Sequence, residues 1–312
     1  MKEIKNPKLT IGIPAYNESK FMHKRLTNIF DQTFTDFEII ISDNGSTDNT
    51  YEICEEYEKK DNRIKKFRQS KNMGWVWNHK FVAEKANGRY FVWAAVDDVW
   101  ESDFLEKNIQ ILDTMKNVVA SISKIERYGP KIEEFENKIN DSIFLRVYKK
   151  IRRHFRPFGP YPASGTYGKK IQIYLKKPSA LGLYSVFRTD VLKKSLVKDR
   201  ISVWDLAFTL EFLKHGDLHV INEVLFHRYT KGISSHGIWD EYKRQKEIRF
   251  FEVIFPHSSF TLWCWKNIGK KNFIKNIHNF TWLNCWRLIG IGFNILNRIK
   301  KYGQSKVDGF QS

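Results

Sequence analysis

The chain has 312 residues, of which 42% are hydrophobic and 15% aromatic, enough for one large α/β domain or a domain with an appendage. The formal net charge of +18 is uneven, because residues 1–100 hold 16 Lys and Arg against 15 Asp and Glu, and residues 101–312 hold 37 against 20. The first part therefore has an ordinary globular surface, whereas the second favours anionic partners: phosphate-bearing substrates, acidic membranes or nucleic acid.

The cysteines argue against a disulfide-rich secreted domain. Cys54, Cys264 and Cys285 lie far apart and match no zinc-binding spacing. This usage favours a reducing compartment. The N-terminal residues contain no apolar stretch of signal-peptide length, so we expect a cytoplasmic protein.

The first hundred residues alternate between predicted strands and helices. Short apolar segments predict strands at Leu9–Ile13, Glu38–Ser42, Ile64–Arg68 and Tyr90–Val96. Helical spacing predicts a helix after each of the first three strands; the second has Ser46 or Thr47 as its N-cap and the third covers Gly74–Ala86. This alternation predicts right-handed crossovers and a largely parallel sheet.

Two adjacent carboxylates, Asp97 and Asp98, follow the predicted strand Tyr90–Val96. Ligands of open α/β sheets bind at the carboxyl ends of the strands. Two acids at such a place repel each other, and a hard divalent cation with oxygen ligands would relieve this repulsion. The alternative is that the pair caps a helix that begins near Asp103.

Three polar loops gather at this edge of the sheet, namely residues 14–18, 43–48 and 97–98. Their convergence is the strongest physical argument for a binding site. Neither GxGxxG after the first strand nor GxxxxGK[ST] occurs in the sequence. This disfavours a dinucleotide oxidoreductase and a P-loop enzyme.

The middle of the chain is polar and basic. Glu126–Asn140 is predicted to be a loop or an exposed helix. A helix over Ile143–Phe158 would have one apolar face and basic residues around the rest of its surface. Such a basic amphipathic helix is typical of a membrane-surface or partner-binding element. The same pattern fits a helix packed on its own domain with solvated basic residues.

Residues 181–231 contain three further predicted elements and a basic loop. We predict a strand at Leu181–Thr189, a helix that opens at Val203–Asp205 and ends at Gly216, and a strand at His219–Phe226. Arg228 and Lys231 then lie in a basic loop. They could hold a diphosphate or be surface charges.

From Glu241 onward the composition shifts. Five of the ten tryptophans lie past residue 238, and Arg287 is the only formal charge between Lys275 and Arg298. Asparagines interrupt the apolar pattern, so a helix lying in a membrane interface is favoured over a spanning helix.

Three motifs in order carry a family resemblance: IGIPAYNE, FEIIISDNGSTDNT and NMGWVWNHKFVAEKANGRYFVWAAVDDVW. They resemble the N-terminal half of family 2 glycosyltransferases, closely over residues 8–112 and loosely over 180–235. The resemblance implies the GT-A fold, a Rossmann-like α/β fold with a mostly parallel sheet flanked by helices. We expect this domain at 1–240, with a nucleotide-sugar half at 1–112 and an acceptor half at 113–240. An aromatic, basic, amphipathic helical tail is expected at 241–312.

The resemblance also implies roles for the loop residues. Pro14, Tyr16 and Glu18 would line the base and ribose, with Tyr16 as a stacking surface. Asp43 and Asn44 would contact the base edge. Asp98 would bind Mn²⁺ or Mg²⁺ directly, and Asp97 would face the ribose or the metal.

Two departures from the family pattern bear on these roles. Many relatives have a second Asp in place of Asn44, and an amide suits more than one base because it both donates and accepts. Many also carry an acid in place of Ala95, which leaves the metal to Asp97 and Asp98.

We therefore interpret the chain as an inverting, metal-assisted glycosyltransferase. It would move a sugar from UDP-sugar or another nucleoside-diphosphate sugar to a glycan or lipid-linked acceptor, as a peripheral protein on the cytoplasmic face of a membrane. Asp205 aligns with the family's acidic position and would be the catalytic base, or else only an N-cap. The alternatives are a sugar-1-phosphate nucleotidyltransferase, whose GxGxR-type loop is missing, and a basic nucleic-acid-binding protein. No nucleic-acid motif of the usual kinds occurs, so we expect no nucleic-acid partner.

Overall fold

The computed structural model describes residues 7–130, 159–230, 255–285 and 288. The chain divides into two compact units, one of Met1–Lys198 with Trp204–Gly232 and one of Asp199–Val203 with Ile233–Ser312. The predicted helix Ile143–Phe158, Lys231 and the predicted border at residue 240 lie outside the described residues. Within the described ranges, no helix is long and apolar enough to cross a membrane.

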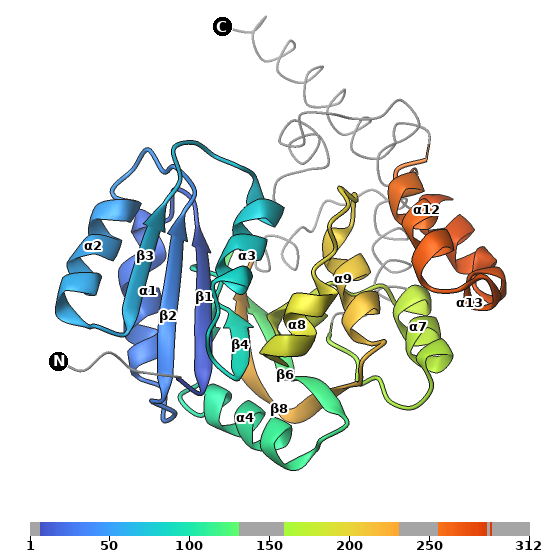
Figure 1. Cartoon of the computed structure of the whole chain (residues 1–312), viewed down its shortest axis with the longest axis horizontal. Coiled ribbons are helices and arrows are strands. Elements are labelled where there is room, and N and C mark those ends of the chain that lie inside the picture. The colour runs from blue at the N-terminus through green and yellow to red at the C-terminus, as the bar shows by residue number, and fades with distance from the viewer. Residues whose placement is uncertain (1–6, 131–158, 231–254, 286–287, 289–312) are drawn as a thin grey trace, which may run out of the picture. The chain divides into compact units, whose positions relative to one another are not determined.

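The first unit is built on one eight-stranded sheet with the order β3-β2-β1-β4-β7-β6-β8-β5 (Figure 1). The strands are β1 (Leu9–Ala15), β2 (Phe37–Asp43), β3 (Ile64–Arg68), β4 (Tyr90–Trp93), β5 (Val99–Trp100), β6 (Val118–Tyr128), β7 (Val186–Arg188) and β8 (Asp217–Tyr229). β3, β2, β1 and β4 are parallel, and β6 is parallel to β8. β7 is antiparallel to both β4 and β6, and β5 is antiparallel to β8.

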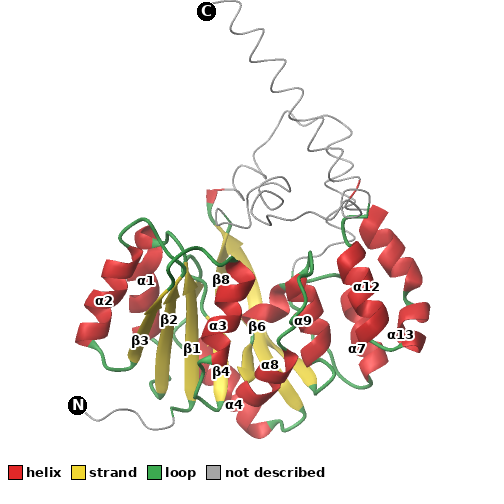
Figure 2. Ribbon diagram, turned by 45° about the horizontal axis from the view of Figure 1, so that its top comes forward, coloured by secondary structure: helices red, strands yellow, loops and turns green. Residues whose placement is uncertain are grey.

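Helices cover both faces of this sheet (Figure 2). They are α1 (Ser19–Phe30), α2 (Thr50–Lys60), α3 (Trp75–Glu84), α4 (Phe104–Thr114), α7 (Tyr167–Lys176), the 3₁₀ turn η1 (Leu181–Tyr184), α8 (Thr189–Ser195) and α9 (Trp204–Phe212). α1 packs on α2, and α3 packs on β1 and β2. The predicted α/β class with a sheet flanked by helices is confirmed.

The central strands form because their residues are buried on both faces. Every residue of β2 and β4 is buried, as apolar runs in parallel strands predict. Beside β4, an aromatic cluster joins the sheet to α9: the ring of Trp93 lies 5.3 Å from Phe208 and 5.8 Å from Phe187. Such edge-to-face ring pairs add stability beyond the area they bury.

Several predicted boundaries are wrong. The strand predicted at Tyr90–Val96 ends at Trp93, so Asp97 and Asp98 lie in a turn before β5 and not directly at the strand end. The segment predicted as a loop or an exposed helix from Glu126 begins inside β6. The strand predicted at Leu181–Thr189 is η1 followed by the short β7.

β8 is longer than predicted. It runs from Asp217 to Tyr229 and pairs with β6 along its length, so Arg228 lies opposite Arg127 in the sheet and not in a loop. The polar residues of β6 and β8 hid this pairing, since strands that leave the core need no apolar run.

The second unit contains α12 (Ser258–Asn267), α13 (Lys270–Lys275) and helical residues 277–285. Phe260, Phe273 and Phe280 pack together, with the rings of Phe273 and Phe280 stacked at 4.7 Å. Asn284 accepts a hydrogen bond from the backbone N–H of His257 at 3.0 Å, which ties the last helix to the start of α12.

Candidate active site

The loops after β1 and β2 are tied to each other by reciprocal hydrogen bonds. The backbone N–H of Asn17 donates to Ser46 Oγ at 2.9 Å, and Asn17 Oδ1 accepts from the backbone N–H of Thr47 at 2.8 Å. Asn17 has a φ of 55° and Gly45 a φ of 71°. A Cβ at Gly45 would lie 2.8 Å from the backbone of Lys71, so this turn requires glycine. The two predicted nucleotide loops therefore form one rigid rim.

Asp48 organises the start of α2 in place of the predicted caps. The helix begins at Thr50, so Ser46 and Thr47 are not its N-cap. Asp48 Oδ1 accepts from the Thr50 backbone at 3.1 Å and hydroxyl at 2.5 Å, and Asp48 Oδ2 accepts from the Ser19 backbone at 3.1 Å. Burial raises the pKa of Asp48, but these hydrogen bonds outweigh it and hold the pKa below its usual value. The carboxylate thus joins the N-termini of α1 and α2.

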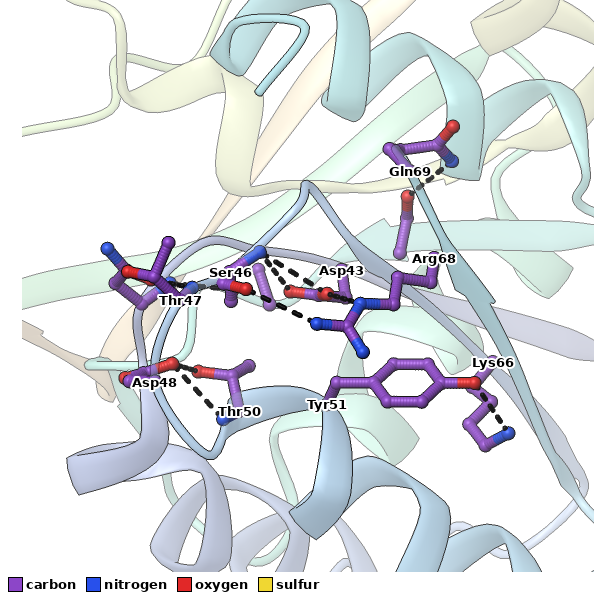
Figure 3. Close-up of polar contacts among 12 residues, drawn as sticks. Asp43, Ser46, Thr47, Asp48, Thr50, Tyr51, Lys66, Arg68 and Gln69 are labelled. Atoms are coloured by element: carbon purple, nitrogen blue, oxygen red, sulfur yellow. Dashed lines mark hydrogen bonds and ion pairs between the residues drawn. The ribbon is translucent and has the colours of Figure 1, made fainter. Parts of the chain in front are cut away.

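Asp43 lies buried at the end of β2 (Figure 3). Its carboxylate accepts from the backbone N–H of Ser46 at 3.2 Å and pairs with Arg68 Nε at 3.4 Å. The Arg68 guanidinium in turn lies over the ring of Tyr51 at 4.4 Å. Asp43 therefore has its charge balanced before any ligand binds.

The amide of Asn44 is occupied within the protein. Its Oδ1 accepts from the backbone N–H of Met73 at 2.9 Å, and its Nδ2 donates to Asn72 Oδ1 at 3.0 Å. The side chain holds the loop before α3 against the end of β2. Its contact with a base stays a prediction. Pro14 and Tyr16 are half-buried, and their contacts with base and ribose also stay predictions.

Asp98 is held rigidly although it lies in a turn. Its side chain is 4% exposed, and Oδ1 accepts from the backbone N–H of Tyr229 in β8 at 3.0 Å. Oδ2 is buried and has no hydrogen-bond partner in the part of the chain that the structure describes. The backbone oxygen of Asp97 accepts from the hydroxyl of Tyr128 at 2.9 Å. Neither acid caps α4, which begins at Phe104 without a side-chain cap.

Three carboxyl groups crowd together at this edge. Burial and the charge of Asp97 raise the pKa of Asp98 to about 7. Burial also raises the pKa of Glu18 to about 7, with repulsion from Asp97, Asp48 and Asp98 adding to it. Burial raises the pKa of Asp97 as well. Mutual repulsion in a desolvated site is the arrangement that a bound cation stabilises.

Arg25 was not predicted as a site residue. It is completely buried in α1, donates through Nη1 to the backbone oxygen of Asp98 at 3.1 Å, and stacks on the ring of Trp100 at 3.7 Å. Burial lowers the pKa of Arg25 to about 9, against the attraction of Asp98 and Asp97. A buried positive charge thus lies under the acidic turn.

Arg25 belongs to a polar stripe on α1 that holds the segment after the acids. Asn28 Nδ2 donates to the Trp100 oxygen at 2.8 Å, and its Oδ1 accepts from the Trp100 N–H at 2.9 Å. Gln32 Nε2 donates to the Glu101 oxygen at 2.8 Å. Arg25 and Asn28 are three residues apart and lie on one face of α1, which was the available sequence signal, whereas Gln32 follows the end of the helix.

Arg228 faces the acids from β8. Its guanidinium lies 5.0 Å from the ring of Tyr184. Attraction from Tyr184, Asp98, Asp97 and Asp205, in that order, raises the pKa of Arg228 above its usual value despite burial. The fold therefore brings Arg228 together with both acids of the turn and with Asp205.

Asp205 is the second residue of α9 and is half-buried. Its Oδ1 accepts from the backbone N–H of Leu206 at 2.8 Å. Asp205 is thus inside the first turn and not at the N-cap position. Its charge acts on both Tyr184 and Arg228, which places it on the same side of the sheet edge as the other candidates.

The donor atoms fit a hard divalent cation. Asp97 and Asp98 offer carboxylate oxygens, and the buried Oδ2 of Asp98 lacks a partner within the described residues. Those residues contain no group of three His, Cys, Asp or Glu side chains that could hold a metal alone. Mg²⁺ commonly takes one or two carboxylates together with substrate phosphates, and two carboxylates suffice in that case.

The sheet carries an acidic turn after β4 and two paired loops at one edge. This is the arrangement expected of the GT-A fold. The family description "Glycosyl transferase family 2" matches residues 10–195, so the chain belongs to this family. A cholesterol galactosyltransferase from Borreliella burgdorferi is 25% identical over 279 residues, 86% of this chain and 73% of that protein. The chain spans less of other curated relatives: the match to a putative teichuronic acid biosynthesis glycosyltransferase from Bacillus subtilis is 33% identical and covers 34% of this chain and 42% of that protein.

Solved structures share the fold. Staphylococcus aureus TarS 1–349 in complex with UDP-GlcNAc has a TM-score of 0.56 at 18% identity and covers 88% of this chain and 80% of that one. A mannosyltransferase from Pyrobaculum calidifontis in complex with GDP-Man and Mn²⁺ has a TM-score of 0.55 at 14% identity, over 96% and 80%.

Proposed function

We propose that the protein is an inverting glycosyltransferase that moves a sugar from a nucleoside-diphosphate sugar to an acceptor hydroxyl, with a divalent metal. One observation carries this proposal. Glu18, Asp97, Asp98 and Arg228, which come from three distant segments, gather at one sheet edge, where the pKa of each group is raised and that of Glu18 and of Asp98 reaches about 7. Such shifts cluster at functional sites.

The donor would lie along the rim formed by the first two loops. Pro14, Tyr16 and Glu18 would line the base and ribose, and Asp43 and Asn44 would lie at the base edge. Asp97 and Asp98 would hold Mn²⁺ or Mg²⁺. The metal supplies positive charge to the leaving diphosphate when it is bound. Arg228 would add positive charge on the same side. Lys231 is proposed as a second diphosphate contact from the sequence alone.

The transfer requires a base on the acceptor side. A bond forms between the acceptor oxygen and the anomeric carbon, while the bond from that carbon to the diphosphate oxygen breaks with its electron pair. The acceptor proton goes to a carboxylate, and Asp205 is the candidate because Asp97 and Asp98 would be engaged by the metal. The products are the glycoside and the nucleoside diphosphate.

The acceptor would be a glycan or a lipid-linked acceptor of the cell envelope. This rests on the relatives, one named for teichuronic acid biosynthesis and one for cholesterol galactosylation. The three cysteines are free thiols, which supports the cytoplasm as the compartment.

The test is a thermal-shift screen of the full chain with UDP- and GDP-sugars, each with Mn²⁺ and with EDTA. A bound donor raises the melting temperature. We expect stabilisation by at least one donor only with the metal, and release of nucleoside diphosphate from that donor. No stabilisation by any donor under either condition would overturn the proposal.

A further inference from the structure

The helical part of the second unit exposes an unusual number of large apolar side chains. Seven side chains between residues 255 and 288 are at least 38% exposed: Phe255, Leu262, Trp265, Ile274, Ile277, Trp282 and Leu288. In the larger first unit only Met73, Trp75, Met115 and Val224 reach this exposure among the described residues. Contiguous exposed apolar groups mark interaction sites.

Four apolar side chains of the second unit line an apolar groove. The space has a volume of about 410 Å³ and is lined by Phe255, Leu262, Trp265 and Phe273, together with Ser258, Thr261 and Asn284. The Trp265 and Phe273 rings meet edge to face at 5.2 Å, which keeps one wall in place. The groove is therefore built by packing between α12, α13 and the last helix.

The described helices of the second unit carry formal charge of one sign. Residues 255–285 contain Lys266, Lys270, Lys271 and Lys275 and no Asp or Glu. All four lysines are exposed. Lysines that flank exposed tryptophan and leucine are typical of a surface that lies in a lipid headgroup layer.

We propose that this face docks on an anionic lipid surface, with the groove taking apolar lipid groups and the lysines meeting the headgroup phosphates. Charge complementarity selects this partner. Two copies of the chain that met through this face would bring eight lysines together without an acid. Nucleic acid would match the lysines but would leave Leu262 and Ile274 without a partner. The proposal is independent of the sugar-transfer chemistry.

The test is flotation of the full-length protein with phosphatidylcholine vesicles and with vesicles that also contain phosphatidylglycerol. We expect recovery with the anionic vesicles only, lost at high salt. Lys270→Gln with Lys271→Gln should lower the partition coefficient roughly thirtyfold, since each lysine contributes about 1 kcal/mol at an anionic surface. Leu262→Asn should lower it about tenfold, because the side chain would no longer be buried in lipid.

Met115→Asn, an exposed apolar residue of the first unit, is the matched control and should change nothing. Unchanged melting temperatures show that the variants fold.

Absence of wild-type binding to anionic vesicles would overturn the proposal, and so would binding that Leu262→Asn leaves intact. A dimer in light scattering that Leu262→Asn dissociates would assign the face to a second copy instead. A salt-sensitive RNA gel shift lost only in the lysine variant would assign it to nucleic acid. Donor hydrolysis, measured on the same samples, reports on the proposed function separately.

Discussion

Replacing Asp98 with asparagine should stabilise the protein in the absence of metal at alkaline pH. The pKa of Asp98 rises from 3.8 to about 7 in the fold. At about 1.4 kcal/mol per pKa unit, ionised Asp98 costs the native state about 4 kcal/mol relative to the unfolded chain. This value already includes the attraction of Arg25, which lies beside the turn. An amide avoids the charge, but its buried N–H₂ takes the place of the partnerless Oδ2 and costs about 1–3 kcal/mol. The net gain should be about 1–3 kcal/mol.

The sign of the pH dependence follows from linkage. An acid whose pKa is raised by folding is ionised first in the unfolded chain, so native stability falls as the pH rises from about 4 to about 7. The full penalty is present above that range. Wild type and Asp98→Asn should therefore differ at pH 8 and converge, or reverse, near pH 4.

The assay is urea unfolding at both pH values in EDTA, with Asp31→Asn, an exposed carboxylate of the first unit, as the control. Adding Mn²⁺ and a nucleoside diphosphate should reverse the order at pH 8, because only the wild type can bind the metal through this carboxylate. The reasoning is refuted if the difference in unfolding free energy between wild type and Asp98→Asn is the same at both pH values.

Three further predictions concern the same site. Asp205→Asn should abolish sugar transfer while donor affinity and melting temperature stay near wild type. The control Glu211→Gln on the same helix should leave the transfer rate nearly unchanged. Retained transfer in Asp205→Asn would show that Asp205 is not the base. Metal-dependent binding of a nucleoside diphosphate, measured by calorimetry, should strengthen roughly tenfold between pH 6 and pH 8, because Glu18 and Asp98 ionise near pH 7; a flat profile contradicts this. Asn28→Ala should lower the free energy of unfolding by about 2–3 kcal/mol and weaken metal binding, because it removes both hydrogen bonds to Trp100, whereas Thr27→Ala on the exposed side of α1 should do neither.

The strands of the first hundred residues could be predicted because parallel strands with helices on both faces must be apolar throughout. β1, β2 and β4 are buried along almost their whole length, whereas the edge strand β3 buries only Ile64. The motifs carried by the loops were specific enough to identify the family. Strand β6 was not predicted, and of β8 only the middle, His219–Phe226, was predicted, because both strands carry polar residues over part of their length. Their pairing is supported by hydrogen bonds between distant segments, and hydrogen bonding by the backbone leaves no mark on side-chain composition.

The sequence by itself determined the class of the protein and which acids lie at the sheet edge, because these depend on local patterns and on the ends of predictable strands. Only the tertiary structure decided how the acids are held. Asp98 is fixed by the backbone of Tyr229, which lies 131 residues further along the chain. Arg25, which follows Lys24 and looks in sequence like part of a solvated basic pair, lies buried beneath Asp98 against Trp100. The energy of a buried charge depends on what surrounds it in space, and distant segments supply those surroundings only when the chain has folded.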